Sequence, residues 1–356
     1  MSKPQKKKKA AWKRVLLIVT CVILALLLVL LAVAGVALNY LDRSLDKLNY
    51  VTGHNTVSPE DASSMAMDEW ISIDPSDTTP YVNAEDITFP TEITEPVGQG
   101  EHIVNILLVG QDAREGQGTQ RSDSMILMTF NKSTGAVTLT SFMRDQYVQI
   151  PGYGATKLCH AYQYGGMSLL NQTLFNHFGV EVDGNVEVNF GGFSEIVDLL
   201  GGVDIKLTSQ EAKKLNEQGG WNLTAGMNHL TGDQALRYSR LRAIDSDFKR
   251  TERQREVLLS LIEAYKNRPL TEMLSLMDKI LPLITTNIPK EQIRSYVIDL
   301  FPMLAGGKVG SVRIPVSGTY VPGNIMVAEG YLASCLYNID FAANRKVLED
   351  LFDEIP

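Results

Sequence analysis

The chain has 356 residues, 44% of them hydrophobic, and carries a formal net charge of −8 at neutral pH. This composition excludes wholesale disorder, because it supplies enough apolar surface for one large packed domain or two ordinary ones. The negative charge argues against general nucleic-acid binding, which requires a broadly basic surface, so any anion site is expected to be local.

The N-terminus predicts a membrane anchor. Residues 15–38 contain no charge, and a helix of that length extends about 36 Å, enough to span a hydrocarbon core of roughly 30 Å with some tilt. Residues 1–14 form a basic tail with seven Lys and Arg and no acid, so the remainder of the chain carries −15. The positive-inside bias therefore predicts a cytoplasmic tail and an extracytoplasmic C-terminal part. A cleaved signal peptide is the alternative, because Ala32 and Ala34 form an A-x-A pattern, but the apolar run is longer than usual for one.

Residues 39–100 are predicted to be an acidic extracytoplasmic linker. No Lys or Arg occurs between residues 48 and 113, and acids, Ser, Thr and Pro recur up to about residue 99. Little apolar periodicity is present, which is typical of a solvated stalk with at most a short helix near residues 61–71. This stalk would separate the anchor from a domain at residues 101–356.

Residues 101–356 alternate between short β-rich runs and amphipathic stretches, as in an α/β fold. Strands are predicted at residues 103–109, 125–130, 137–142, 186–190, 203–207 and 312–314. Helices are predicted at residues 167–178, 193–200, 209–217, 248–267, 271–280, 291–304 and 344–352. We expect a single domain with a central mixed sheet flanked by helices.

The loop NKSTG at residues 131–135 is a short polar connector between two predicted strands, which indicates an antiparallel hairpin. The start of the first strand then lies beside the end of the second. Asp123 precedes the hairpin and Arg144 follows it, so the hairpin places a carboxylate and a guanidinium at one sheet edge.

Asp112 joins this edge if residues 103–109 pair antiparallel with the first hairpin strand, and Arg121 lies in the long connecting loop. Each residue alone is better explained as a turn residue or a surface ion-pair member. Together, Asp112 and Asp123 suit Mg²⁺ bound largely through phosphate oxygens, and the arginines suit bidentate binding of phosphate. The sequence therefore predicts a magnesium and phosphate site here.

Six of the fifteen arginines lie within residues 237–255. Arg240 and Arg242 alternate around Leu241, so in an extended stretch both would point the same way. Arginine offers a planar fork that matches phosphate geometry, whereas lysine offers a point charge. This segment is therefore the second predicted source of phosphate contacts.

A helix beginning near Phe248 would carry a stripe whose first turn is polar and whose remainder is apolar. The stripe comprises Arg250, Arg253, Gln254, Val257, Leu258 and Leu261. The helix N-terminus would add partial positive charge for an anion. The remaining charged residues of this segment are expected to form a solvated face: Lys249, Glu252, Arg255 and Glu256.

Cys159 and Cys335 are the only thiols beyond the apolar N-terminal run, and their spacing matches no metal or redox motif. A disulfide between them is left open. The five histidines show no paired zinc-ligand spacing.

Five ordered segments resemble the motifs of the LytR-CpsA-Psr family of cell-wall polymer ligases. They are NILLVGQDAREGQGTQRSDSM (105–125), SFMRD (141–145), KLCHAYQYGG (157–166), LGGVD (200–204), and GMNHLTGDQALRYSRLR with DFKRTERQ (226–254). The match spans roughly residues 103–257, with a weaker tail to about residue 350. Five motifs in order are far more specific than one glycine-rich match.

The resemblance implies a membrane-anchored, extracytoplasmic α/β enzyme that binds a polyprenyl pyrophosphate-linked glycopolymer with Mg²⁺. Such enzymes transfer the phosphorylated polymer to N-acetylmuramic acid of peptidoglycan and release polyprenyl phosphate, while the lipid tail occupies an apolar channel. By motif match, Asp112 and Asp123 lie on the magnesium side. The pyrophosphate-binding set corresponds to Arg144, Lys157, Arg240, Arg242, Arg250 and Gln254, and Arg121 and Arg253 match further motif positions that are expected to bind pyrophosphate as well.

Two residues depart from the family pattern: Met143 stands where many members have proline, and Cys159 where many have asparagine. The first should alter only loop rigidity. The second removes an amide close to Lys157, so hydrogen bonding there is expected to differ.

The leading functional hypothesis is phosphotransfer, with Arg144, Arg240 and Arg242 stabilising charge as the bond to the lipid phosphate breaks. Asp247 and Asp123 are the candidate bases for the attacking sugar hydroxyl. Hydrolysis of the same lipid pyrophosphate and non-enzymatic anchoring of wall polymer are the alternatives. A DNA-binding role is disfavoured because the arginines are predicted to lie outside the cytoplasm. The sequence does not distinguish a teichoic acid from a capsule-type polymer.

Overall fold

The computed structural model describes residues 39–51, 53, 56–73, 78–90, 93, 95–98, 100, 102–112, 120–242, 244, 247–266, 268–306 and 309–353. The chain divides into two compact units, residues 1–47 and residues 48–356. In the first unit, the described residues 39–45 are helical; the predicted anchor at residues 15–38 lies outside the described part. Among the residues described, no helix is both long enough and apolar enough to cross a membrane.

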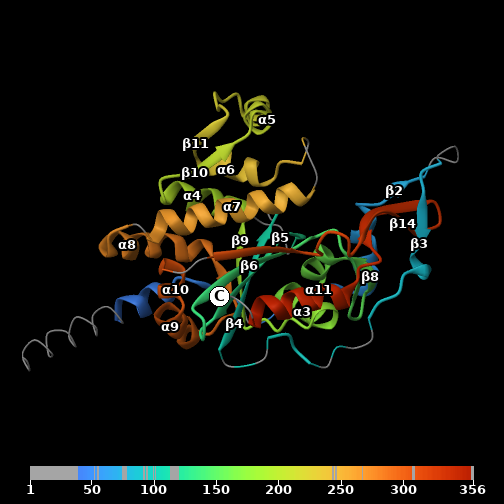
Figure 1. The fold of residues 1–356 in the computed structure, drawn as a ribbon, viewed down its shortest axis with the longest axis horizontal. Helices are drawn as coiled ribbons and strands as arrows, with labels where there is room; N and C mark the ends of the chain where they lie inside the picture. Colours follow the sequence, from blue (N-terminus) through green and yellow to red (C-terminus); the bar gives the residue numbers. More distant parts are fainter. Residues whose placement is uncertain are drawn as a thin grey trace, which may run out of the picture. The chain divides into compact units, whose positions relative to one another are not determined.

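A mixed sheet of seven strands forms the centre of the second unit (Figure 1). In spatial order its strands are β1 (Asn49–Tyr50), β12 (Thr285–Thr286), β9 (Gly184–Asn189), β4 (Ile103–Gln111), β5 (Ser122–Asn131), β6 (Ala136–Phe142) and β13 (Val309–Ile314). The pairs β1–β12, β9–β4 and β6–β13 are parallel, and the other three are antiparallel. The predicted α/β fold with a central mixed sheet is confirmed.

The predicted hairpin is formed by β5 and β6. The Asn131 side chain accepts hydrogen bonds from the backbone N–H groups of Ser133 and Thr134 at 3.0 and 3.1 Å. Gly135 follows with a φ of 75°, a conformation that glycine adopts without a steric penalty. Turn chemistry encoded in the local sequence therefore sets the register that brings the start of β5 beside the end of β6.

Helices cover both faces of the sheet. Odd-numbered β4 residues such as Leu107 pack with α3 (Leu158–Phe178) and α11 (Phe341–Asp353), which lie together in Figure 1. Even-numbered residues such as Ile106 pack on the opposite face, against the second set of helices: α7 (Asp247–Lys266), α9 (Lys290–Asp299) and α10 (Phe301–Gly306). Burial of both faces explains why these strands read as nearly continuous apolar runs.

The strand predicted at residues 203–207 exists but does not join the central sheet. It is β10 (Val203–Leu207), and it pairs with β11 (Gly226–Leu230) in a separate two-stranded sheet. Its residues alternate between buried and exposed, so other side chains pack against only one face of β10. In a central strand, both faces are packed. The packing on β10 comes from a second core that also contains α4 (Phe190–Leu199), α5 (Ser209–Gly219), α6 (Gly232–Ser239) and α8 (Leu270–Ile280).

The stalk expected at residues 39–100 is corrected by the structure, because much of its described part belongs to the folded unit. It contributes α2 (Pro59–Met67), whose Ala62 and Ala66 are buried, and two edge strands. These edges complete a four-stranded sheet in the order β2 (Ile71–Ser72), β15 (Tyr331–Tyr337), β14 (Val321–Ala328) and β3 (Tyr81–Asn83). Edge pairing uses backbone groups, so the polar side-chain pattern gave no sign of it.

The predicted helices are present, with two changes. The helix predicted from residue 167 extends back as α3 to Leu158 across a kink, because Gly165 and Gly166 have non-helical backbone angles. The helix predicted at residues 291–304 is divided into α9 and α10. The remaining strands, β7 (Tyr147–Ile150) and β8 (Gly154–Lys157), form a short antiparallel pair that leads into α3.

The close packing of α6 on α4 yields a stability prediction. A Cβ atom at Gly232 would lie 2.1 Å from the backbone oxygen of Ser194, so Gly232→Ala should lower the free energy of unfolding by about 1–3 kcal/mol. At Gly191, on α4, a Cβ atom meets only an ordinary contact at 3.5 Å, so Gly191→Ala should be neutral or stabilise by about 0.4–1 kcal/mol. Urea denaturation measures both, and equal effects would contradict the close contact.

Candidate active site

A cavity of about 660 Å³ lies between the central sheet and helices α4, α6, α7 and α8. Most of its wall is apolar, including Leu108, Ile126, Val186, Phe193, Leu258 and Ile262. Its charged lining, apart from Lys266, comprises Asp123, Arg144, Arg240, Arg242 and Arg250. The cavity therefore combines an arginine-rich part with an apolar part, and four guanidiniums against one carboxylate favour an anion.

Helix α7 lines both the charged part and the apolar part of this cavity. Arg250 and Gln254 line it from the first turns of α7, Leu258 and Leu261 from the middle, and Tyr265 from the last turn. At 1.5 Å per residue, the step from Arg250 to Tyr265 is about 22 Å. The predicted stripe with a polar start and an apolar remainder is confirmed for these residues. The cavity therefore changes from charged to apolar along α7.

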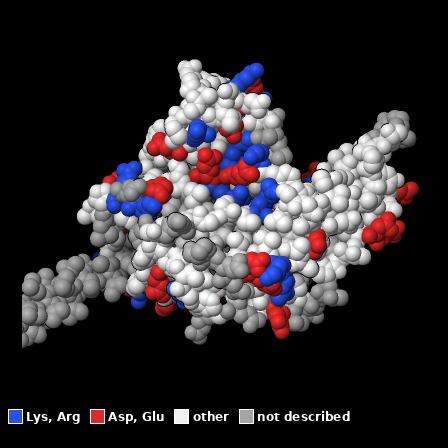
Figure 2. Space-filling model, viewed as in Figure 1, with Lys and Arg blue, Asp and Glu red and all other residues white. Residues whose placement is uncertain are grey.

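Arg240 and Arg242 line the cavity from the end of α6, on either side of buried Leu241. The Arg240 guanidinium stacks 4.2 Å from the centre of the Phe190 ring and lies 3.6 Å from Asp112 Oδ2. Both arginines line this cavity, but Arg240 has helical backbone angles (φ −104°, ψ −2°), so the extended stretch on which the expectation rested is not present at Arg240. Figure 2 shows basic and acidic side chains next to each other in the middle of this face, where Figure 1 places α6 and α7.

Arg144 and Asp123 form an ion pair at the predicted sheet edge. Asp123 occupies an irregularity in the β4–β5 pairing, since Gly110 pairs with Ser124 and Gln111 with Ser122. Burial lowers the pKa of Arg144, but the surrounding carboxylates, among them Asp145 and Asp123, outweigh burial and raise this pKa above its ordinary value. Arg144 therefore remains charged at the cavity wall.

Asp112 follows β4 directly, so it lies at the same sheet edge as Asp123, as predicted. Its side chain is 45% exposed beside Arg240, whereas Asp123 is 18% exposed beside Arg144. Two carboxylates at the ends of adjacent strands provide the oxygen donors that Mg²⁺ prefers. The donor set therefore fits that ion.

Lys157 and Arg121 do not belong to the cavity lining and instead contact Glu69. Lys157 Nζ lies 2.8 Å from Glu69 Oε2, and Arg121 Nη1 lies 2.9 Å from Glu69 Oε1. Burial raises the pKa of Glu69, but the nearby positive charges of Lys157, Arg144 and Arg121 outweigh burial and lower this pKa to about 2. Glu69 therefore holds two of the predicted phosphate ligands in place.

Sequence reasoning missed Glu69 because it lies within the expected stalk. One signal was available: Trp70 follows Glu69 and is the only tryptophan between residues 13 and 220. A large aromatic residue in an otherwise polar segment indicates packing, and Trp70 stacks 5.8 Å from Tyr331.

Arg253 faces away from the cavity, although it matches the same family motif as Arg250. It is 4% exposed, its Nε donates to Glu211 Oε1 at 2.7 Å, and its Nη1 donates to the Leu241 carbonyl at 2.9 Å. Its guanidinium also lies 5.8 Å from the Tyr238 ring centre. These contacts stabilise the junction of α5, α6 and α7, so the pyrophosphate role expected of Arg253 is not supported.

The expected solvated face of α7 is only partly correct. Lys249 and Glu252 form an exposed pair at 2.7 Å. Arg255 is buried, with Nη1 donating to Ser141 Oγ at 2.7 Å, and Glu256 accepts a hydrogen bond from the Tyr238 hydroxyl. Asp247 begins α7, and its side chain lies outside the described part.

With this geometry in view, the family model described as LytR_cpsA_psr matches residues 66–336. The chain belongs to the LytR-CpsA-Psr family. The matched region begins near the end of α2, which agrees with the packing of Glu69 and corrects the domain start expected at residue 101. Cys159 and Cys335 are both buried free thiols in this family member.

Curated relatives in the LytR-CpsA-Psr family carry transferase names. The chain is 36% identical over 224 residues to the polyisoprenyl-teichoic acid–peptidoglycan teichoic acid transferase TagT of Bacillus subtilis, covering 60% of this chain and 68% of that protein. It is 36% identical over 207 residues to TagU of Bacillus anthracis, covering 57% and 66%.

Solved structures of TagT share the fold. TagT bound to LIIa-WTA superposes with a TM-score of 0.58 at 27% identity, covering 76% of this chain and 98% of that one. TagT with bound octaprenyl pyrophosphate lipid gives a TM-score of 0.54 at 26% identity with the same coverage.

The buried Arg253–Glu211 pair predicts a structural effect. Arg253→Met should lower the free energy of unfolding by about 3–5 kcal/mol, because Glu211 keeps a buried charge without its partner. Arg237 pairs with Asp233 on the surface, so Arg237→Met should cost about 1 kcal/mol or less. Urea denaturation compares them. An Arg253→Met protein of normal stability that no longer binds pyrophosphate would show that Arg253 contacts the ligand instead.

His160 predicts a dependence of stability on pH. Burial lowers its pKa from 6.5 to about 4, so the unfolded chain gains a proton at a higher pH than the folded protein. The contribution of neutral His160 to the free energy of unfolding is complete above pH 6.5. It is lost as pH falls from 6.5 to 4, and its size is about 3 kcal/mol. His160→Asn should flatten urea-denaturation stability across this window in metal-free buffer. If the free energy of unfolding of the wild type and of His160→Asn falls equally across this window, the assignment to His160 is wrong. Buried His177 is present in both proteins and so cannot produce a difference between them.

Proposed function

We propose that this protein transfers a phosphate-linked glycopolymer from a polyprenyl pyrophosphate carrier to peptidoglycan. The observation that carries the proposal is the single cavity with an arginine-lined part and an apolar part. An amphiphile with an anionic head and a long hydrocarbon tail matches both parts. The names of TagT and TagU, and the TagT structure with octaprenyl pyrophosphate, support the same substrate class.

The head group would contact Arg144, Arg240, Arg242 and Arg250. Arg144 and Arg250 lie in the wall with little exposure, whereas Arg240 and Arg242 are exposed at the opening. Buried guanidiniums bind phosphate oxygens in a low-dielectric environment, where charge stabilisation is strongest. Gln254, whose amide lies 3.5 Å from the Asp123 carbonyl, would add a neutral donor beside them.

In the proposed reaction, a sugar hydroxyl of peptidoglycan attacks the phosphorus that carries the polymer. A new phosphorus–oxygen bond forms as the bond to the bridging oxygen breaks, and polyprenyl phosphate leaves with that electron pair. The arginines neutralise the charge that develops on the leaving phosphate. Mg²⁺ held by Asp112 and Asp123 would reduce the negative charge of the pyrophosphate.

The hydroxyl proton needs an acceptor. Asp123 is engaged in an ion pair with Arg144 and would also hold Mg²⁺, so its carboxylate oxygens already have partners. Asp247 at the start of α7 remains the other candidate, and we propose that it takes this role.

We also propose that residues 15–38 anchor the chain in a bacterial cell membrane with its C-terminal part outside the cytoplasm. The absence of charge in this run and the seven basic residues before it support this placement. The acceptor polymer is then on the same side of the membrane as the cavity.

The transfer is tested by incubating the full chain with Mg²⁺, a synthetic polyprenyl pyrophosphate glycan and peptidoglycan oligomers. Mass spectrometry should detect polyprenyl monophosphate and glycan attached to the oligomers, and both should decrease on removal of Mg²⁺. Release of free phosphorylated glycan alone would identify a hydrolase, and retention of intact lipid would identify a polymer anchor.

Two arginines one turn apart on α6 provide a matched comparison in this assay. Arg240→Gln should slow transfer by about 100-fold, because one charged donor to the reacting phosphate is removed. Arg237→Gln should leave the rate unchanged, because Arg237 pairs with Asp233 away from the cavity. Equal rates for the two variants would contradict the placement of the head group.

A further inference from the structure

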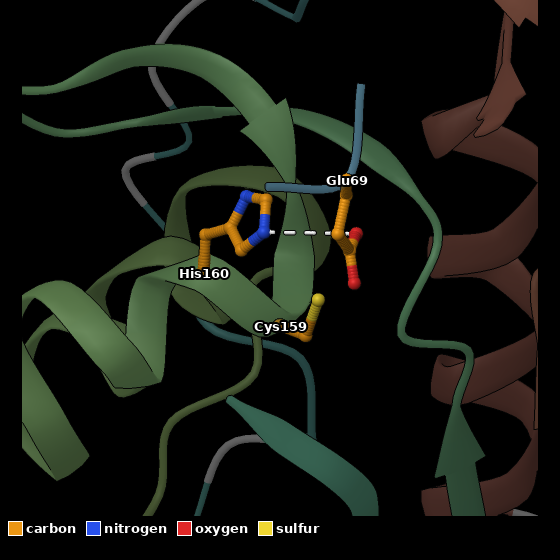
Figure 3. Close-up of side chains that lie close together, drawn as sticks. All are labelled: Glu69, Cys159 and His160. Carbon is orange, nitrogen blue, oxygen red and sulfur yellow. Dashed lines mark ion pairs between the residues drawn. The ribbon is translucent and has the colours of Figure 1, made fainter. Parts of the chain in front are cut away.

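A second group of potential ligands lies outside the cavity lining. Glu69, Cys159 and His160 place a carboxylate oxygen, a sulfur and an imidazole nitrogen within 4.8 Å of one another. Figure 3 shows Glu69 approaching from the segment after α2, opposite Cys159 and His160 in the first turn of α3. Glu69 therefore converges here with two residues that lie far from it in the chain.

His160 directs a free nitrogen into this group. Its side chain is 2% exposed, and its Nδ1 lies 2.9 Å from Thr156 Oγ1. Among the described residues Nε2 has no hydrogen-bond partner and lies 3.8 Å from Glu69 Oε2. That separation is too long for a hydrogen bond, and it is close to the ~3.4 Å between two ligands of one tetrahedral ion with bonds of ~2.1 Å.

Cys159 supplies the sulfur ligand of this group. Burial raises the pKa of the thiol, as do the carboxylates of Asp145 and Glu69, while the guanidinium of Arg144 and the ammonium of Lys157 lower it. A coordinated metal ion removes the remaining proton outright. The thiol is therefore inert without a metal and a strong ligand with one.

We propose that Glu69, Cys159 and His160 bind a divalent ion of the zinc class, with a fourth position open to water. Sulfur and imidazole ligands select zinc or cobalt and disfavour Mg²⁺. On binding, the Cys159 sulfur forms the bond to the metal and its proton passes to solvent. This site is separate from the Asp112 and Asp123 site and does not depend on the proposed transfer.

The charged side chains around this site already contact Glu69, so an ion would compete for its oxygens. Lys157 Nζ lies 2.8 Å from the same Glu69 oxygen that faces His160, so the ion competes with Lys157 for that oxygen. Arg121 contacts the other oxygen and can stay paired. Occupancy of the site would therefore release Lys157 from Glu69.

The experiment titrates the reduced, metal-free full chain with Co²⁺. A sulfur-to-cobalt charge-transfer band should appear in the near ultraviolet, saturate at one ion per chain, and disappear when Zn²⁺ is added. Excess Mg²⁺ should not displace it. Each unit of higher pH should tighten binding about tenfold, because one thiol proton is released. A folded wild-type protein without this band would overturn the proposal.

Two thiol variants identify the ligand. Cys159→Asn introduces the residue common in the family and should abolish the band, while Cys335→Ser removes the other buried thiol and should retain it. Circular dichroism verifies folding, and His160→Asn, which should weaken Co²⁺ binding, replaces Cys159→Asn if that variant fails to fold. A folded Cys159→Asn protein that keeps the band would refute the site.

Discussion

The antiparallel pairing of β4, β5 and β6 is the constraint on which the charged part of the cavity depends. It brings the end of β4, the start of β5 and the residue after β6 to one edge of the sheet. Asp112, Asp123 and Arg144 therefore lie at the same sheet edge, although they come from three different segments of the chain. A one-residue slip in either pair would turn side chains to the opposite face, so the turn at residues 131–135 contributes to the site as well as to the fold.

The arginines are held in position by internal carboxylates. Arg144 pairs with Asp123, Arg240 lies near Asp112, and Glu69 contacts both Lys157 and Arg121. Cations that are oriented before a ligand arrives lose less entropy on binding, although each ligand phosphate must compete with the carboxylate already present. Mg²⁺ at Asp112 and Asp123 would relieve this competition by occupying two of those carboxylates.

The site residues that could be predicted from sequence are those positioned by local patterns. The hairpin follows from its turn residues, and the α7 stripe follows from helical periodicity, so Asp123, Arg144, Arg250 and Gln254 are found where expected. Glu69 has no periodic pattern around it and only the neighbouring Trp70 as a signal, because its position depends on edge strands and on a small contact surface of α2. Such contacts are set by partners far away in the chain, which leave no periodic signal.

Arg250 and Arg253 show why a motif position does not define a role. They are three residues apart on α7, which corresponds to about 300° of rotation, so their side chains leave the helix 60° apart. That difference directs Arg250 to the cavity and Arg253 to Glu211 in the first turn of α5. Two arginines that match one family motif therefore have different surroundings in this chain: Arg250 lines the cavity, and Arg253 fixes the helix that carries Arg250. Loss of Arg253 would therefore displace Arg250 without removing any group from the cavity wall.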